Sequence, residues 1–181
     1  PAIVRIFDVG HTEQGDPFIS MELLAGTNLR QALAGGPFDP VRAVRMLLPI
    51  VRALECAHRA GIVHRDVKPD NILLEVGTGR ALVTDFGIAH GGKDSGPLTD
   101  PGKIMGTAHF ISPEQAAAGP IDGRSDIYSL GVVGYLAVSG RLPFEATNLP
   151  ALLVKQATER PPSVMRAAPG LPPALAAAID R

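Results

Sequence analysis

Four polar residues in the middle of the sequence have types and spacings that suit chemistry on phosphate groups. Asp66, Lys68 and Asn71 lie close together in the chain, and Asp85 follows a short apolar stretch. Carboxylate and amide oxygens suit Mg²⁺, a hard ion that keeps several waters and is usually shared with substrate phosphates. Lys68, two residues after Asp66, is expected on the same side of an extended loop, where it adds a cation for developing phosphoryl charge. The pattern therefore indicates metal-assisted phosphoryl transfer.

A helix and a hairpin are predicted to position these residues. Asp39 is a typical N-cap, Pro40 suits the first helical position, and Gly61 ends the helix. Residues 72–76 and 81–84 are predicted as two hairpin strands, and the second leads directly into Asp85. Apolar residues recur at the spacing of one helix face, at Val41, Val44, Leu47, Leu48, Val51 and Leu54.

Further elements follow from similar patterns. Residues 3–9 and 18–23 are β-rich and flank a polar turn around Gly15, which predicts another hairpin. A helix is expected from an N-cap at Ser125 to Ser139, apolar on nearly every side and therefore buried. Asn148 is expected to open a helix that runs to Thr158, and residues 173–181 begin another.

Three motifs then occur in a fixed order: His64-Arg65-Asp66 with Asn71, Asp85-Phe86-Gly87, and Ser112-Pro113-Glu114. Together they resemble the catalytic loop, the metal motif and the activation-segment end of eukaryotic-type (Hanks-type) protein kinases. The sequence around these motifs resembles that of the bacterial Ser/Thr branch of the family. The resemblance implies an α+β fold in which residues 1–24 are the end of the small lobe and the hinge, and residues 25–181 are a truncated, helical large lobe.

The resemblance also implies roles in catalysis. It makes Asp66 the residue that accepts or orients the substrate hydroxyl proton and Lys68 the cation for the γ-phosphoryl group, while Asn71 and Asp85 hold Mg²⁺. It implies that His64, Phe86 and Gly87 are packing residues. For His64, this role is preferred over that of a metal ligand or a base. It has Asp126 bond the backbone near His64 and Arg65, and a buried aspartate requires such partners in any case.

ATP contacts are implied for the stretch after the first hairpin. The resemblance places Met21 at the gatekeeper position and residues 22–24 in the hinge that faces adenine. Without the downstream motifs, this stretch reads equally well as an ordinary strand that leads to a turn at Gly26. The implied ATP-binding residues are Met21, Glu22, Leu24, Asn28 and Leu73.

Residues 91–102 are rich in turn formers and poor in apolar residues, which indicates a surface loop. In the resembling family this is the activation loop, with Ser95 and Thr99 as candidate phosphoacceptors and Thr99 preferred. A phosphate there is expected to pair with Arg65.

Thr107 is expected to hydrogen-bond Asp66 and Lys68. Glu114 normally pairs with an arginine further along, and Arg181 comes too early for that role, so Glu114 is expected to be exposed or to take another cation.

The amino-acid composition limits the classes of protein to which the chain can belong. The 181 residues are 45% hydrophobic with a formal net charge of −1, which gives no electrostatic reason to expect a nucleic-acid partner. No apolar run reaches membrane-spanning length and no signal peptide is visible, so a cytoplasmic domain is expected. This expectation leaves room for a membrane anchor in a segment outside this sequence. Cys56, the single cysteine, is expected to be a buried small hydrophobe. Because the chain begins at Pro1, we interpret it as a fragment.

Three hypotheses remain. The first is an ATP- and Mg²⁺-dependent kinase that phosphorylates Ser or Thr in proteins; the second is a non-catalytic pseudokinase or docking module. The third, a small-molecule phosphotransferase, is disfavoured by the long segment that ends in Pro-Glu. The sequence contains no Gly-x-Gly-x-x-Gly loop and no position for the lysine that holds ATP. We therefore expect negligible phosphate transfer by these 181 residues alone.

Overall fold

The computed structural model describes residues 2–86 and 106–181, so the predicted sites at Gly87, Ser95 and Thr99 lie outside the described residues. Short strands come first, and helices dominate thereafter, giving the predicted α+β class. The elements are, in chain order, β1 (Ile6–His11), β2 (Pro17–Met21), β3 (Gly26–Asn28), α1 (Leu29–Leu33), α2 (Pro40–Arg59), the 3₁₀ helix η1 (Pro69–Asn71), β4 (Ile72–Glu75), β5 (Ala81–Val83), α4 (Pro113–Ala116), α5 (Gly123–Ser139), α6 (Leu149–Thr158), α7 (Val164–Ala167) and α8 (Pro173–Ile179).

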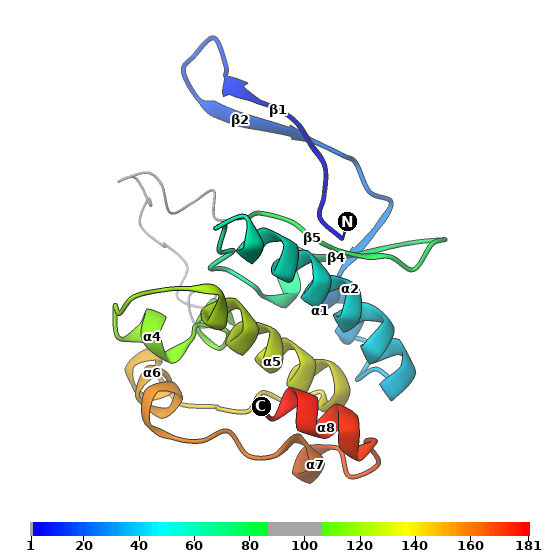
Figure 1. Cartoon of the computed structure of the whole chain (residues 1–181), viewed down its shortest axis with the longest axis vertical. Coiled ribbons are helices and arrows are strands. Elements are labelled where there is room, and N and C mark those ends of the chain that lie inside the picture. Colours follow the sequence, from blue (N-terminus) through cyan, green and yellow to red (C-terminus); the bar gives the residue numbers. More distant parts are fainter. Residues whose placement is uncertain (1, 87–105) are drawn as a thin grey trace.

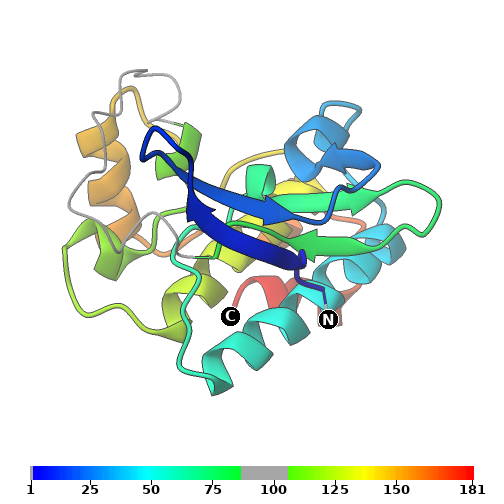
Figure 2. The ribbon, with the colours of Figure 1, turned by 90° about the horizontal axis from the view of Figure 1, so that it is seen from above.

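Helix α5 lies at the centre of the helical body, between α2 on one side and α7 and α8 on the other (Figure 1). The small sheet with β4 and β5 lies on the side of α2 that faces away from α8, as the view from above also shows (Figure 2). One apolar core joins these layers, with Ile50 and Leu54 of α2, Ile72 of β4 and Val133 of α5 all fully buried. The two elements that flank the loop between α2 and β4 are therefore both anchored in the core.

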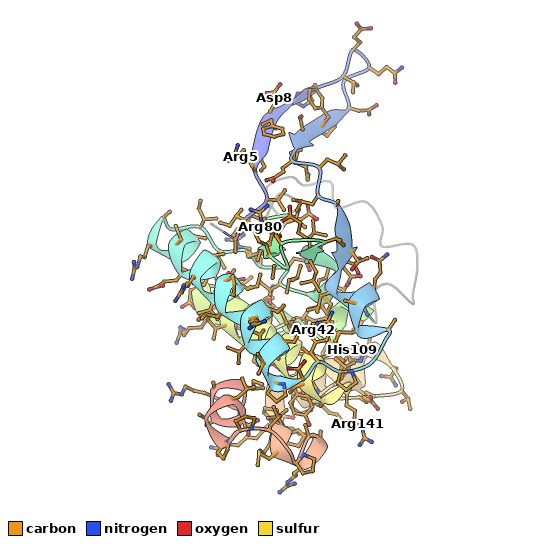
Figure 3. All side chains as sticks on the ribbon, turned by 90° about the vertical axis from the view of Figure 1, so that its right-hand side faces the viewer. Arg5, Asp8, Arg42, Arg80, His109 and Arg141 are labelled. Atoms are coloured by element: carbon orange, nitrogen blue, oxygen red, sulfur yellow. The ribbon has the colours of Figure 1, made fainter. Side chains whose placement is uncertain are left out.

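The hairpin β1–β2 projects from this body, and Arg5 and Asp8 mark its base and its first strand in Figure 3. The strands pair antiparallel, and their turn has Gly15 at a positive φ of 88°, as the polar turn predicted. Before the hairpin, Ile3 pairs with Val83 of β5, and the Val4 amide donates to the Val83 carbonyl at 3.0 Å. The start of the chain is thereby tied to the strand that leads into Asp85.

The second sheet has the strand order β3-β4-β5, all antiparallel, and contains the predicted hairpin of β4 and β5. At Gly26 the backbones of β3 and β4 approach so closely that a Cβ atom would lie 2.1 Å from the Leu74 carbonyl oxygen. Only glycine fits at such a separation. This sheet brings the residues after the first hairpin next to the strand that follows the catalytic loop.

Helix α2 begins as predicted, because the Asp39 carboxylate accepts hydrogen bonds from the amides of Val41 and Arg42. Of the apolar face that the sequence indicated, Leu54 is fully buried and Leu47 packs against the core while partly buried. The buried side chains are Ala43, Met46, Ile50, Ala53, Leu54 and Ala57, whereas Val41, Val44, Leu48 and Val51 are exposed. Helix α2 packs against both α5 and β5, and its Leu47 lies close to α5, since a Cβ on Gly134 would be 3.4 Å from the Leu47 side chain. Cys56 is also exposed, contrary to expectation.

Helix α5 is mostly buried, as predicted, but it begins earlier than expected. Asp122 is the N-cap, and its carboxylate accepts from the Arg124 amide at 2.8 Å. Ser125, the predicted cap, is instead buried and donates its hydroxyl to Glu114. Asn148 caps α6 as predicted, accepting from the Ala151 amide. Of the helices in the described ranges, none combines the length and the apolar character that a membrane crossing requires.

Candidate active site

The loop between α2 and β4 brings three of the predicted residues into one hydrogen-bonded cluster. The Lys68 ammonium donates to Oδ2 of Asp66 at 2.7 Å, and the Asn71 amide donates to the same oxygen at 3.0 Å. The Asn71 amide also donates to the Asp66 backbone carbonyl at 2.9 Å. Both donors use Oδ2, and within residues 2–86 and 106–181 no side-chain donor bonds the other carboxylate oxygen of Asp66.

Asp126 on α5 holds the backbone of this loop, as the sequence predicted. Its carboxylate is 1% exposed and accepts from the amides of His64 at 2.8 Å and Arg65 at 2.7 Å. A third bond joins it to Nε2 of His58 at 2.7 Å. Sequence reasoning assigned no role to His58, because its partner is 68 residues away in the chain and no local spacing signals the contact.

His64 is fully buried and uses both ring nitrogens within the fold. Nε2 lies 2.9 Å from the Thr84 carbonyl oxygen, so Nε2 carries the proton, and the neutral Nδ1 accepts from the Asp66 amide at 3.2 Å. Its ring also packs against that of Phe86, with centroids 4.5 Å apart. The contacts fit the predicted packing role and leave neither nitrogen for a metal or a base.

Asp85 stands directly after β5 in a left-handed conformation with φ of 60°. The preceding residue, Thr84, donates its amide to the Asn71 carbonyl at 3.0 Å and its hydroxyl to Asp85 at 3.3 Å. The backbone that carries Asp85 is therefore hydrogen-bonded to the backbone that carries Asn71. Within the described residues, no cluster of three or more His, Cys, Asp and Glu side chains gathers at metal-binding distance.

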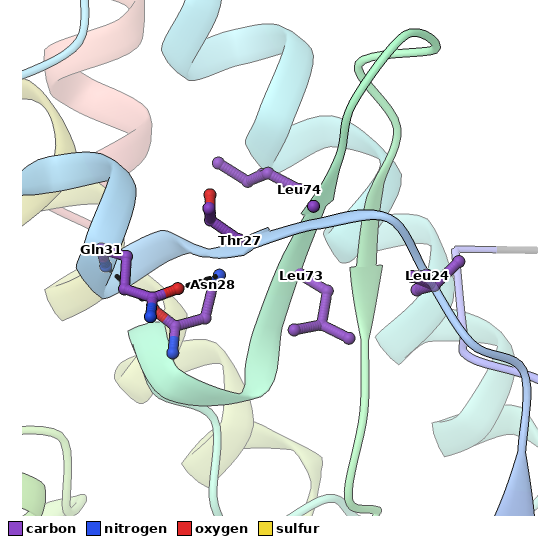
Figure 4. A pocket seen from close by; sticks show the side chains of 7 residues that line it. Leu24, Thr27, Asn28, Gln31, Leu73 and Leu74 are labelled. Atoms are coloured by element: carbon purple, nitrogen blue, oxygen red, sulfur yellow. Dashed lines mark hydrogen bonds between the residues drawn. The ribbon is translucent and has the colours of Figure 1, made fainter.

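A cavity of about 190 Å³ lies where β3 and the start of α1 face β4 (Figure 4). It contains three of the predicted ATP-binding residues, Leu24, Asn28 and Leu73, and it is completed by Gly26, Thr27, Gln31 and Leu74. Met21 and Glu22 do not line it. Asn28 also caps α1, because its side-chain oxygen accepts from the Gln31 amide at 2.8 Å.

An ion pair ties α1 to the catalytic loop. Arg30 donates two parallel hydrogen bonds to Asp70, at 2.7 and 2.8 Å. These side-chain hydrogen bonds from Arg30 lower the pKa of the Asp70 carboxyl below its ordinary value, against the opposing effect of partial burial. The pair joins α1, which follows the cavity residue Asn28, to η1, which contains Asn71, and sequence reasoning did not find it.

The segment from Gly106 onward is anchored at several points. Gln156 of α6 donates to the carbonyls of Ala108 and His109, both at 3.0 Å, and the Ser129 hydroxyl donates to the Phe110 carbonyl at 2.6 Å. The expected bonds from Thr107 were not found: among residues 2–86 and 106–181, none joins it to Asp66 or Lys68. Lys68 and Asn71 take that place on the Asp66 carboxylate.

Glu114 differs from its expected environment. It is half-buried, no basic side chain in the described ranges forms an ion pair with it, and it accepts a hydrogen bond from the Ser125 hydroxyl. Burial raises its pKa, but hydrogen bonds from Ser125, from the backbone and from Ser112 outweigh burial, so the pKa is lowered overall. Hydroxyl groups thus replace the cation that we expected.

The fold and site together define an α+β protein that has a small cavity against β4 and a carboxylate, lysine and amide cluster in the loop before β4. Comparison with known families identifies the class, since the model of the protein kinase domain matches residues 1–167. The chain belongs to the protein kinase family.

Curated relatives include bacterial serine/threonine-protein kinases. The probable serine/threonine-protein kinase PknB of Corynebacterium glutamicum is 43% identical over 165 residues, which cover 88% of this chain and 25% of that protein. Serine/threonine-protein kinase PknA of Mycobacterium tuberculosis is 43% identical over 178 residues, which cover 96% of this chain and 40% of that protein. The chain thus spans well under half the length of these relatives.

Proposed function

We propose that the whole protein is an ATP- and Mg²⁺-dependent kinase that transfers the γ-phosphoryl group to Ser or Thr hydroxyls of other proteins. The observation that carries the proposal is the Asp66 carboxylate, with Lys68 and Asn71 on one oxygen and the other oxygen left for a substrate. Its protein substrates and its action in the cytoplasm, where ATP is available, belong to the same proposal.

In this reaction the substrate hydroxyl oxygen attacks the γ-phosphorus of ATP. The bond from that phosphorus to the bridging oxygen breaks, ADP leaves, and the hydroxyl proton passes to Asp66. Lys68, 2.7 Å from the Asp66 carboxylate, is the proposed cation for the charge that develops on the transferring group. Positioning and charge neutralisation supply most of the rate in such reactions.

The residues present fit a magnesium ion. The Asn71 amide nitrogen donates both of its hydrogen bonds to Asp66, so its side-chain carbonyl oxygen would be the atom that holds the ion, and Asp85 would supply a carboxylate. Two protein ligands suit an ion that takes its other ligands from water and phosphates. When bound, Mg²⁺ neutralises charge on the ATP phosphates.

We assign the cavity of Figure 4 to ATP, with Leu24 and Leu73 against the adenine and Asn28 near the ribose. Met21 and Glu22 remain proposed gatekeeper and hinge residues. Residues 1–24 are assigned to the end of the small lobe and residues 25–181 to the large lobe. Arg65, with an exposed side chain, is the proposed partner of a phosphate on Thr99 or Ser95.

The test is phosphate transfer by the whole protein and by its Asp66→Asn variant. Asparagine keeps the size of the side chain but cannot take a proton, so we expect transfer to a Ser- or Thr-containing protein to fall by about 10² to 10⁴. Glu55→Gln, on the exposed side of α2, is the matched control and should leave the rate unchanged. Equal rates for wild type and Asp66→Asn, with both folded, would favour a non-catalytic docking module.

A further inference from the structure

Gln115 makes two side-chain hydrogen bonds that join α4 to the catalytic loop. Its Oε1 atom accepts from the Ser112 amide at 3.1 Å, which completes the capping box at the start of α4. Its Nε2 atom donates to the backbone carbonyl of Arg65 at 2.8 Å, across 50 residues of chain. Because the capping bond fixes the orientation of the amide group, the nitrogen is directed at Arg65.

The Arg65 carbonyl belongs to the peptide unit that carries Asp66. Arg65 is one of the few non-glycine residues with a positive φ, 69°, a conformation that requires support from its surroundings. Its amide is held by Asp126 and the next amide, that of Asp66, by His64. The carbonyl between them has Gln115 as its partner, so this bond completes the fixation of the peptide unit on both sides.

We propose that Gln115 is a positioning residue for Asp66. By holding the Arg65–Asp66 peptide unit, it keeps the Asp66 carboxylate oriented toward the substrate hydroxyl. It also links the end of the activation segment to the catalytic loop. The effect of Gln115 on catalysis rests on the proposed function. Its effect on the peptide unit, which should become more mobile without Gln115, does not rest on that function.

Two variants of Gln115 separate positioning from helix capping. Gln115→Glu keeps an acceptor for the Ser112 amide, since glutamate serves equally well in a capping box, but it removes the donor to Arg65. Gln115→Met removes the donor without adding charge. The control is Ser112→Ala, which removes the cap bond to the Gln115 amide at 3.4 Å and the Ser112 hydrogen bond to Glu114, and leaves the bond to Arg65 intact.

In the whole protein we expect both Gln115 variants to lower kcat by about 3- to 10-fold, the size of one hydrogen bond, with the KM values for ATP and protein substrate unchanged. Ser112→Ala should keep the wild-type kcat. Hydrogen exchange at the Asp66 amide should be faster in both Gln115 variants than in wild type or Ser112→Ala. This second measurement needs no phosphate transfer, so it decides the mechanical claim even if the protein is not a kinase.

The inference is overturned if Asp66 amide exchange stays at the wild-type rate in both Gln115 variants. It is also overturned if kcat in an active protein changes less than twofold, or if Ser112→Ala lowers kcat as much as Gln115→Glu does. A loss confined to Gln115→Glu would assign the effect to the added charge and would equally contradict it. Loss of transfer in the wild type would reject the proposed function and leave the exchange result to stand alone.

Discussion

Asp126 shows how one buried side chain organises the catalytic loop. Three donors, from His58, His64 and Arg65, converge on its two oxygens in the protein interior. A buried carboxylate without such partners is strongly disfavoured, and buried amides without an acceptor are costly as well. The loop conformation and the buried charge therefore depend on each other, and the left-handed Arg65 is held as part of the same arrangement.

Because Asp70 forms an ion pair with Arg30, protonation of this one carboxyl should lower the free energy of unfolding at acidic pH. The pKa of Asp70 is lowered in the folded state, so its contribution is fully present above the unfolded-state value of about 3.9 and is lost as the pH falls through the folded-state pKa. We expect Asp70→Asn to unfold at lower urea concentration than wild type at pH 7. The difference between the two midpoints should shrink as the pH falls below about 4.

Arg30→Gln is the matched partner variant for this experiment. It should lower the pH 7 midpoint in the same way and should add little in an Asp70→Asn background, because one interaction is removed only once. A midpoint difference between wild type and Asp70→Asn that is equally large at pH 7 and pH 2.5 would contradict the assignment.

At the scale of elements, the approach of β3 to β4 sets a strict limit on one position. A Cβ on residue 26 would lie 2.1 Å from the Leu74 carbonyl oxygen, a backbone atom that cannot move without separating the strands. We expect Gly26→Ala to lower the free energy of unfolding by about 1 to 3 kcal/mol, as measured by urea denaturation. Part of the cavity wall should shift with the strand.

Gly35→Ala is the control for that change, because the nearest atom to its Cβ is 3.7 Å away, an ordinary contact distance. It removes the same backbone freedom from the unfolded chain without a collision. If Gly26→Ala and Gly35→Ala unfold at the same urea concentration, the close approach of β3 and β4 has no energetic consequence.

Local sequence signals predicted most helices and strands. The errors concern features that depend on contacts between elements far apart in the chain. Asp39 and Asn148 were identified as caps because capping is decided within a few residues. Asp122 and Ser125 are both good capping residues, and the choice between them depends on Glu114, which uses the Ser125 hydroxyl. On α2, apolar residues occupy more than one face, and which of them are buried depends on how α5 and β5 pack against the helix.

The candidate site was predicted to a similar degree. Asp66, Lys68 and Asn71 lie within one short loop, so their convergence follows from local geometry. Gln115 bonds the loop at Arg65, 50 residues away in the chain, and His58 bonds Asp126, 68 residues away, so neither spacing nor composition signals these contacts. These distant residues support the loop, whereas the residues that the motifs identify are the ones proposed to meet substrate.

At the scale of the whole molecule, the hairpin and the helical body differ in burial. Most of β1 and β2 is exposed on both faces, including Phe7 at 62% and Val9 at 66%, whereas α5 is buried along most of its length. The cluster around Asp66 belongs to the buried body. The cavity assigned to ATP is lined by β3, α1 and β4, together with Leu24 from the segment before β3 (Figure 4).

This arrangement predicts that residues 1–181 alone retain the catalytic cluster but transfer phosphate negligibly. Phosphoryl transfer needs a lysine on the ATP phosphates and a glycine-rich loop over them, and this sequence has neither. The measurement compares phosphorylation of a generic basic protein by purified residues 1–181 and by the whole protein, each with its Asp66→Asn variant. We expect transfer that depends on Asp66 in the whole protein and none above background in the isolated chain. Robust transfer by residues 1–181, abolished by Asp66→Asn, would show that the cluster and the open cavity suffice for catalysis.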